Sequence, residues 1–342
     1  MQDTTDKLIS QLKSKKVLKI VITTHHKPDA DALGSSLALW HFLKKIGHNV
    51  VIVSPTDYPP YLCWMPGEHE VINFEENTEK AIELCENADL IFCLDFNDLS
   101  RINKFGEYVG KSKALKIMID HHRNPAGFDD YRFWTIETSS TSELIYDFIQ
   151  KCQSNHLIDK DIASCLYAGI MADTGSFRFS STSSKTHRIA AELIDLGVES
   201  AKIQALLLDN FSLSRYRLMG YVLYKKLHTF PKLKTALVYL SQEELQRFNI
   251  QTGDTEGFVN YGLGIKGIVF SALIVDRTEM IKMSFRSQGS FPCNEFAEKY
   301  FNGGGHLNAS GGWSKDTLNE VVSKFKEVLP EYRNQLLSSL DE

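Results

Sequence analysis

The sequence has few of the features that mark membrane-bound or secreted proteins. None of its apolar runs reaches the ~18 residues that a membrane-spanning helix needs. The first residues, Met1–Lys7, are polar and lack the apolar core of a signal peptide. The six cysteines are scattered and include no Cys-x-x-Cys pair. We therefore expect small buried thiols in a reducing environment, a cytoplasmic protein and no membrane as a partner.

The chain also lacks an excess of positive charge. It has 38 basic and 43 acidic residues, which gives a net charge of -5 at pH 7. Proteins that bind long nucleic acid through its phosphates need a basic surface. We therefore expect no long duplex nucleic acid as a partner, whereas a local basic pocket for a small phosphorylated ligand stays compatible with this charge.

Internal repeats and low-complexity segments are absent too, so a repeat architecture is not expected. Hydrophobic residues make up 43% of the chain and charged residues 24%, as in ordinary globular proteins. A chain of 342 residues is long for one core and suits two domains.

The first part of the chain alternates short apolar runs with helical patterns. A β-branched run at 18–23 predicts a buried strand, and an apolar stripe over 32–46 predicts the helix that follows it. Further strands are predicted at 50–53, 90–94 and 115–119, and further helices at 81–85, 142–152, 159–171, 185–196 and 199–208. This alternation predicts an α/β fold with a doubly wound, mainly parallel sheet.

The pattern changes after residue 209. Strands are predicted at 236–240, 268–275 and 280–285, with a short helix at 242–248. Strands that follow each other so closely indicate a smaller α+β domain. We therefore expect a catalytic domain at 1–209, a linker at 210–229 and a second domain at 230–342, with the two domains facing each other across a cleft.

Acidic and histidine residues gather where the predicted elements of the first domain end. Their sequence motifs are His25-His26-Lys27-Pro28-Asp29-Ala30-Asp31, Asp95, Asp120-His121-His122 and Asp173. Side chains at the carboxyl ends of parallel strands meet in one crevice. A lone Asp in such a place is usually a helix cap, but so many carboxylates together would repel one another unless cations neutralise them. The pattern favours a hydrolase of phosphoesters with two metal ions.

The mixture of carboxylate and imidazole ligands indicates the kind of metal. Such a set suits Mn²⁺ better than Ca²⁺, and Mg²⁺ or Co²⁺ are the alternatives. We expect two divalent ions about 3.5–4 Å apart, with Asp95 as the candidate bridging ligand.

In the second domain, Gly303-Gly304-Gly305-His306 and Arg286 are the candidate phosphate ligands. Glycines can form a nest of successive backbone amides around an anion, and a guanidinium can grip a terminal phosphate.

Together these motifs resemble the DHH phosphoesterase superfamily, and residues 301–311 resemble its DHHA1 domain. The resemblance implies that His25 and Asp29 hold one ion, that Asp31, His121 and Asp173 hold the other, and that Asp95 bridges them. It gives catalytic roles to His122, facing the scissile phosphate, and to Asp120, orienting the imidazoles. Arg286, Gly303, Gly304, Gly305 and His306 would bind substrate. Lys27 and Ala30 depart from the asparagine and glycine of many relatives, without removing a ligand.

By architecture, the chain resembles the short oligoribonucleases of this superfamily. The resemblance implies an Mn²⁺-dependent exonuclease on very short single-stranded RNA, with removal of the 3'-phosphate of 3'-phosphoadenosine 5'-phosphate as a further activity. The alternatives are a phosphodiesterase for cyclic or linear dinucleotides and, in a different class, a catalytically silent nucleotide sensor. The Ser-Arg-Lys-Lys run of the related pyrophosphatases is absent. The oligomeric state stays open, with a homodimer as one option.

Overall fold

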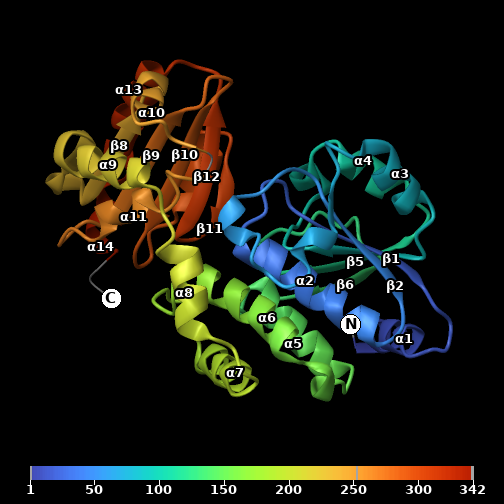
Figure 1. Ribbon diagram of the computed structural model, residues 1–342. Helices are drawn as coiled ribbons and strands as arrows, with labels where there is room; N and C mark the ends of the chain where they lie inside the picture. The colour runs from blue at the N-terminus through green and yellow to red at the C-terminus, as the bar shows by residue number, and fades with distance from the viewer. Residues whose placement is uncertain (1, 252, 340–342) are drawn as a thin grey trace. The chain divides into compact units, whose positions relative to one another are not determined.

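The computed structural model describes residues 2–251 and 253–339. The chain divides into two compact units, Met1–Asn210 and Phe211–Glu342 (Figure 1). Among the described residues, no helix combines the length and the apolar character needed to cross a bilayer. All six cysteines lie in the described part of the chain and are free, and five of them are buried.

The first unit is built on a six-stranded sheet in which every pairing is parallel. Its order is β3-β2-β1-β4-β5-β6. The strands are β1 (Lys19–Thr24), β2 (Asn49–Ser54), β3 (Val71–Asn73), β4 (Leu90–Leu94), β5 (Leu115–Asp120) and β6 (Tyr131–Trp134). The predicted doubly wound parallel sheet is confirmed. The order reverses between β1 and β4, and ligands of such sheets bind beyond the carboxyl ends of the strands at this point.

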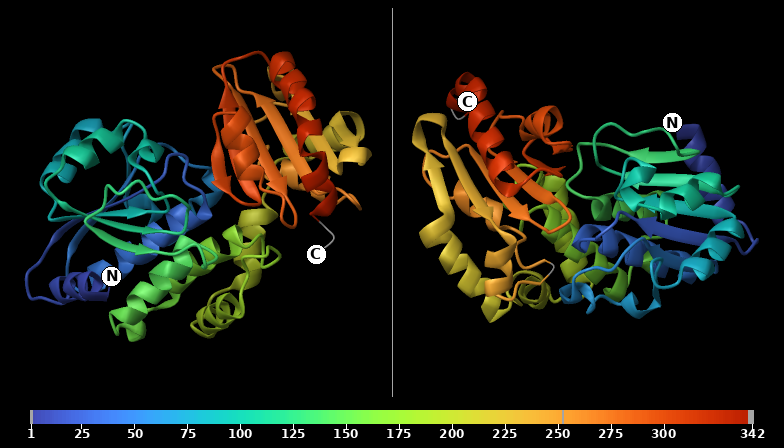
Figure 2. Two further views of the ribbon diagram at one scale, coloured as in Figure 1. Left: turned by 180° about the vertical axis from the view of Figure 1, so that it is seen from behind. Right: turned by 90° about the horizontal axis from the view of Figure 1, so that it is seen from above.

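Helices cover both faces of this sheet (Figures 1 and 2). They are α1 (Gln2–Leu12), α2 (Ala30–Lys45), α3 (Thr78–Glu86), α4 (Phe105–Lys111), α5 (Thr141–Lys151), α6 (Lys160–Asp173), α7 (Ser184–Asp195) and α8 (Ser200–Leu208). Helix α2 packs closely against α6, because a Cβ on Gly34 would lie only 2.5 Å from the carbonyl oxygen of Cys165. Glycine at this position therefore sets how near the two helices come.

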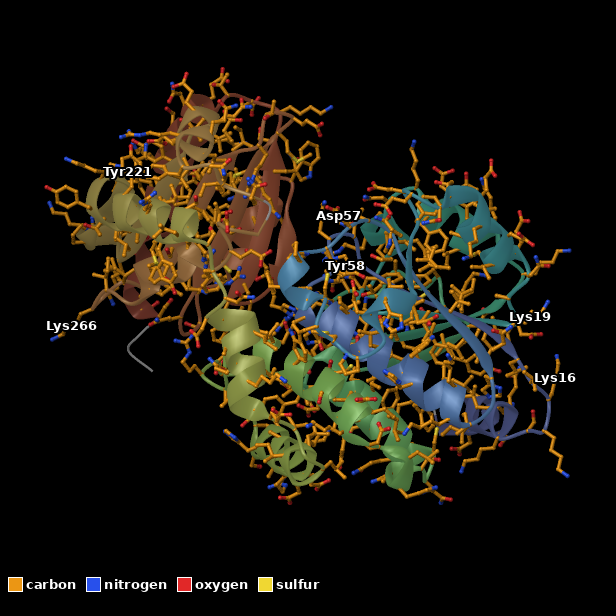
Figure 3. The ribbon with its side chains drawn as sticks, in the orientation of Figure 1. Lys16, Lys19, Asp57, Tyr58, Tyr221 and Lys266 are labelled. Carbon is orange, nitrogen blue, oxygen red and sulfur yellow. The ribbon has the colours of Figure 1, made fainter. Side chains whose placement is uncertain are left out.

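At the amino-terminal edge of the sheet, Asp89 makes one hydrogen bond to the backbone and one ion pair. Asp89 accepts a hydrogen bond from the backbone N–H of Lys19 at 2.8 Å, and its other oxygen lies 3.3 Å from Nζ of Lys16. Figure 3 labels Lys16 and Lys19 at this end of the first unit. These groups lie at the start of β1, so they fix the sheet at the end away from the clustered carboxylates that follow β1 and β4.

The second unit has a mixed sheet with the order β11-β12-β10-β9-β8-β7. The strands are β7 (Leu227–Phe230), β8 (Thr235–Leu240), β9 (Phe270–Asp276), β10 (Ile281–Ser287), β11 (Gly304–His306) and β12 (Ala309–Ser314). The helices are α9 (Leu213–Tyr221), α10 (Gln242–Arg247), α11 (Phe258–Leu263), α12 (Cys293–Tyr300), α13 (Leu318–Val328) and α14 (Arg333–Ser338). The β8–β9 pairing is parallel and the other pairings are antiparallel. The predicted smaller α+β domain is confirmed.

Residues 210–229, which the sequence suggests as a linker, are mostly structured. They form α9, a π-helical segment at Val222–Lys226 and the start of β7. Arg215 on α9 is buried, and its guanidinium donates to the carbonyl oxygen of Glu256 at 2.7 Å. This segment therefore packs as part of the second unit.

Candidate metal centre

The loop after β1 presents His25 and Asp29 side by side. Asp29 caps α2, since its Oδ1 accepts hydrogen bonds from the backbone N–H groups of Asp31 at 2.9 Å and Ala32 at 3.0 Å. Its other oxygen, Oδ2, lies 3.9 Å from Nε2 of His25. The Nδ1 of His25 lies 2.9 Å from the carbonyl oxygen of His26, so the opposite ring nitrogen faces the carboxylates.

Asp95 follows β4 and lies between two histidines. Its Oδ2 is 3.4 Å from Nε2 of His25, and its Oδ1 is 3.4 Å from Nε2 of His121. The side chain is buried, and the backbone has a φ of +63°, in the left-handed region that non-glycine residues rarely adopt. The strained backbone places one carboxylate where each oxygen meets a different imidazole.

A second group comes from α2, from the residue that follows β5, and from α6. Nε2 of His121 lies 3.2 Å from Oδ2 of Asp173, which is the last residue of α6. Asp31 is fully buried in the first turn of α2. One ligand atom from each of Asp31, His121 and Asp173 lies within 4.8 Å of the others, and the same holds for His25, Asp29 and Asp95. The six predicted metal ligands thus form two adjoining groups.

Asp120 and His122 flank these groups. Asp120 ends β5, and its Oδ1 lies 2.8 Å from Nδ1 of His122. Its Oδ2 is buried and has no hydrogen-bond partner among the described residues. His122 Nδ1 is also 3.7 Å from Oδ1 of Asp95. The geometry suits the orienting role expected for Asp120.

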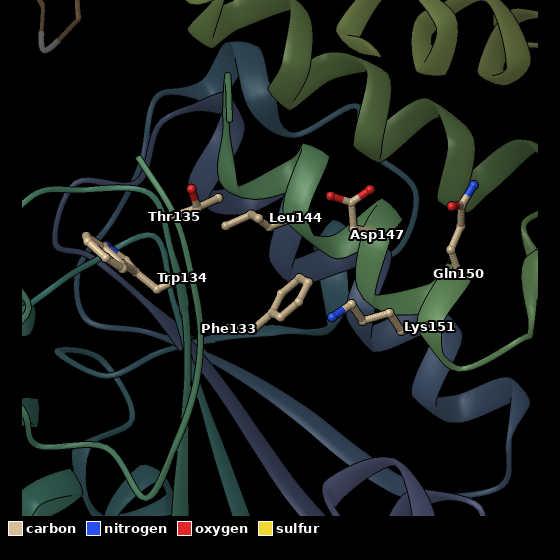
Figure 4. Close-up of a pocket in the computed structure, with 7 residues that line it drawn as sticks. All are labelled: Phe133, Trp134, Thr135, Leu144, Asp147, Gln150 and Lys151. Atoms are coloured by element: carbon tan, nitrogen blue, oxygen red, sulfur yellow. The ribbon is translucent and has the colours of Figure 1, made fainter. Parts of the chain in front are cut away.

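Two residues that the sequence analysis missed contact His122 and the candidate ligand Asp95. The indole N–H of Trp134 donates to the carbonyl oxygen of His122 at 2.6 Å, and the hydroxyl of Thr141 donates to Oδ1 of Asp95 at 2.9 Å. Trp134 also lines a cavity of about 510 Å³ between β6 and α5 (Figure 4). Neither residue belongs to a motif that the ligands define, and only the folded sheet brings them to the centre.

The charges of the cluster change the proton affinities of its members. Burial alone would lower the pKa of His25, but the hydrogen bond to Asp95 and the charge of Asp29 raise it to about 9. Burial would also lower the pKa of His121, but the hydrogen bond to Asp95 and the charge of Asp173 raise it to about 10. Burial and then the charge of Asp95 raise the pKa of Asp31 to about 7. Burial followed by the charge of Asp31 raises the pKa of Asp173 well above its ordinary value.

Asp95 shows the opposite shift. Burial would raise the pKa of its carboxyl, but hydrogen bonds from His121 and His25 hold it well below the ordinary range. The cluster therefore keeps protons on its two imidazoles near neutral pH, and burial together with neighbouring negative charge also favours the protonated forms of Asp31 and Asp173. Divalent cations would displace those protons, and the buried Oδ2 of Asp120 has no hydrogen-bond partner among the described residues. The donor set fits two divalent ions.

In the second unit, strand register brings Arg286 and His306 together. Arg286 on β10 pairs with Ala309 on β12, and His306 on β11 pairs with the same alanine. Residues directly opposite each other on neighbouring strands point to the same face. The two side chains, both half-buried, therefore flank a small residue on one face of the sheet.

The three glycines before His306 differ from their expected form. Gly304 and Gly305 belong to strand β11, and a Cβ on Gly303 would lie 1.9 Å from the carbonyl oxygen of Gly311. Successive amides of a regular strand point to opposite edges, so this geometry differs from the expected nest, and the binding of phosphate by these glycines stays a prediction. Gly303 and Gly305 allow β11 to lie close to β12, since a Cβ on Gly305 would lie 2.6 Å from the carbonyl oxygen of Ala309.

The fold and the two acidic groups define the class of α/β phosphoesterases whose sites suit divalent cations. The chain belongs to the DHH family: the model of the DHH family, N-terminal domain, matches residues 19–170, and that of the DHHA1 domain matches residues 232–333. It is 31% identical over 321 residues to the bifunctional oligoribonuclease and PAP phosphatase NrnA of Thermus thermophilus, covering 93% of this chain and 90% of that protein.

Two further comparisons bear on the fold and on the alternatives. The crystal structure of an exopolyphosphatase-related protein from Bacteroides fragilis matches with a TM-score of 0.93 and 41% identity, over 98% of each chain. The cyclic-di-AMP phosphodiesterase GdpP of Geobacillus thermodenitrificans is 27% identical over 92% of this chain, which spans 47% of that longer protein. The DHH and DHHA1 resemblance seen in the sequence is therefore confirmed.

Proposed function

We propose that this protein hydrolyses phosphoester bonds, releasing mononucleotides from very short RNA oligonucleotides and removing the 3'-phosphate of 3'-phosphoadenosine 5'-phosphate. The observation that carries the proposal is the pair of ligand groups that meet at Asp95, in a chain similar over nearly its full length to an oligoribonuclease and PAP phosphatase. With divalent cations bound, such a site would stabilise the negative charge that develops on phosphoryl oxygens.

The proposed cofactor is a pair of divalent ions, with Mn²⁺ first and Mg²⁺ or Co²⁺ as alternatives. His25 and Asp29 would hold one ion, Asp31, His121 and Asp173 the other, and Asp95 both. Bound there, the ions would supply Lewis-acid stabilisation of negative charge on the phosphoryl group. Mixed imidazole and carboxylate donors support this choice over Ca²⁺.

His122 is the proposed catalytic residue among the protein side chains. Its Nδ1 lies against Asp120, which fixes the orientation of the ring. With Nδ1 held, Nε2 is the atom that would donate a hydrogen bond or a proton to a substrate oxygen. Trp134 fixes the backbone of the same residue through its carbonyl oxygen.

Arg286 and His306 are the proposed phosphate ligands of the second unit. Their shared position beside Ala309 would let both contact one anionic group. A guanidinium binds phosphate through two parallel hydrogen bonds and so fixes its orientation. A protein that holds one terminal phosphate in this way would favour short substrates over long RNA.

The test is a product time course with purified protein and Mn²⁺. The substrates are a 5'-phosphorylated RNA dinucleotide, a five-mer, a 24-mer, 3'-phosphoadenosine 5'-phosphate, cyclic di-AMP and pyrophosphate. We expect mononucleotides to appear fastest from the dinucleotide and the five-mer. Asp95→Asn should lower kcat by about a hundredfold or more, because it weakens both ligand groups at once.

A cyclic dinucleotide phosphodiesterase is the second candidate, because of the similarity to GdpP. Consumption of cyclic di-AMP alone would support it and contradict the short-RNA assignment. Binding of nucleotides without any turnover, in the wild type as in Asp95→Asn, would favour a silent sensor instead.

A further inference from the structure

We propose that the first turn of α5 is a positioning device for the metal centre, with Thr141 as its positioning residue. It fixes the carboxylates of Asp95 and Asp31, which belong to different ligand groups, relative to one another. The inference rests on the two-ion site of the proposed function and adds the reason why the two groups keep a fixed separation.

The first step concerns the rotation of the Asp95 carboxylate. A carboxylate that serves two groups must keep one oxygen toward each. The Thr141 hydroxyl donates to Oδ1, the oxygen that faces His121, at 2.9 Å. Both side chains are buried, so water does not compete for the bond. The hydroxyl therefore locks Oδ1 toward the second group and leaves Oδ2 toward His25.

The second step concerns Asp31. Its Oδ2 accepts the backbone N–H of Thr141 at 2.7 Å, and its Oδ1 accepts the backbone N–H of Ser142 at 2.8 Å. Both oxygens of one carboxylate are thus held by the same helical turn.

The third step separates this role from ordinary helix capping. The cap of α5 is Ser140, whose hydroxyl accepts the backbone N–H of Glu143 at 3.0 Å. The hydroxyl of Thr141 does not contribute to that cap, since it donates to Asp95. The first amides of a helix need acceptors, and here Asp31, which lies on α2, supplies them.

The fourth step is the packing that permits these contacts. Gly169 on α6 faces the junction, where a Cβ would lie 2.0 Å from Oγ of Ser142 and 2.7 Å from Oδ1 of Asp31. A larger residue at this point would push α6 away from both α5 and α2. Helix α2 therefore meets α5 and α6, which follow much later in the sequence, at Asp31, and the turn at Thr141 joins both ligand groups.

The experiment measures Mn²⁺ binding rather than turnover. Free Mn²⁺ is quantified by electron paramagnetic resonance during a titration, and the bound spectrum is inspected for coupling between two close ions. Thr141→Val removes the hydroxyl and keeps the side-chain shape, whereas Thr141→Ser restores the hydroxyl. Thr235→Val is the matched control, because Thr235 is a buried threonine of the second unit whose hydroxyl donates to the carbonyl oxygen of Leu233.

We expect Thr141→Val to weaken binding of at least one ion by about 10- to 100-fold and to lose the coupled spectrum. Thr141→Ser and Thr235→Val should bind as the wild type does. If Thr141→Val does not fold, Thr141→Ala tests the same hydroxyl without a methyl group against Asp95.

Two results would overturn the inference in distinguishable ways. Two coupled ions bound equally well by the wild type and by Thr141→Val or Thr141→Ala would refute the role of Thr141 and leave the proposed function intact. A wild type that binds no Mn²⁺ would refute the two-ion site itself, and the inference would fail with it.

Discussion

At the scale of single residues, the centre is a set of charges that cannot all be ionised together without a counter-charge. Four carboxylates and two imidazoles form the two adjoining ligand groups: Asp29, Asp31, Asp95, Asp173, His25 and His121. The raised pKa values of His25 and His121, about 9 and about 10, mean that protons serve as the counter-charge near neutral pH. Metal binding must therefore be coupled to proton release.

This coupling gives a prediction for isothermal titration calorimetry. At pH 7 both imidazoles are protonated in the metal-free protein, because pH 7 lies below both pKa values. As ligands they are neutral, so binding two ions at pH 7 should release at least two protons, with a further contribution from the carboxyls of Asp31 and Asp173, whose pKa values are raised. The release should diminish as the pH rises through 9 and 10. Titrations in buffers of different ionisation enthalpy measure the number, and a value of zero at pH 7 would contradict the pKa shifts.

The sequence predicts which carboxylates and imidazoles gather at the candidate site, and it does so for a physical reason. Asp95 and Asp120 sit at the ends of buried strands whose composition is easily recognised, and parallel strands bring those ends together. Thr141 and Trp134 escape prediction because their roles depend on where α5 and β6 dock. Strand β6 is four half-buried residues long, too short for a periodic signal.

At the scale of elements, the start of α5 is fixed from two directions. Its backbone amides bind Asp31 on α2, and its Glu143 binds residues beyond α5. The carboxylate of Glu143 is buried and accepts hydrogen bonds from Ser139 at 2.6 Å and Thr186 at 2.9 Å, with Lys185 Nζ at 3.1 Å. Burial would raise the pKa of Glu143, but these contacts outweigh it and lower the pKa.

Glu143→Gln should therefore destabilise the protein in a pH-dependent way. A lowered pKa in the fold means that ionised Glu143 stabilises it above the ordinary pKa of 4.5, and that this contribution is lost as the pH falls through the folded-state value. We expect a loss of about 1–3 kcal/mol at pH 7.5, shrinking toward pH 4. Thermal unfolding at both pH values measures it.

Glu107→Gln is the matched control, because Glu107 is exposed and faces Lys111 at 3.8 Å. An exposed ion pair of this kind contributes less than about 1 kcal/mol. A Glu143→Gln loss that is equal at pH 4 and pH 7.5 would show that the side-chain shape, and not its charge, is what stabilises α5.

At the scale of the whole molecule, the two units differ in the charge of their candidate sites: acidic side chains gather in the first, and basic side chains are the proposed phosphate ligands in the second. The net charge of -5 and the acidic centre of the first unit disfavour long polyanions. The second unit offers Arg286 and His306 on one sheet face. On the proposed function, a substrate with few phosphates would meet little repulsion and would still find a cation for its terminal phosphate. The charge distribution therefore agrees with the proposed preference for short RNA.

Arg286→Ala tests this division of tasks. Removing a guanidinium that pairs with a phosphate costs about 1.5–3 kcal/mol of binding, so KM for a 5'-phosphorylated dinucleotide should rise about 10- to 100-fold. Turnover at saturation should change far less, because the metal ligands lie in the first unit. Arg333→Ala, an exposed arginine on α14, is the control and should leave KM unchanged. Kinetics on dinucleotides with and without the terminal phosphate measure the effect. If Arg286→Ala raised KM for both dinucleotides equally, Arg286 would bind some other part of the substrate, and a terminal-phosphate contact could not be the source of the preference for short RNA.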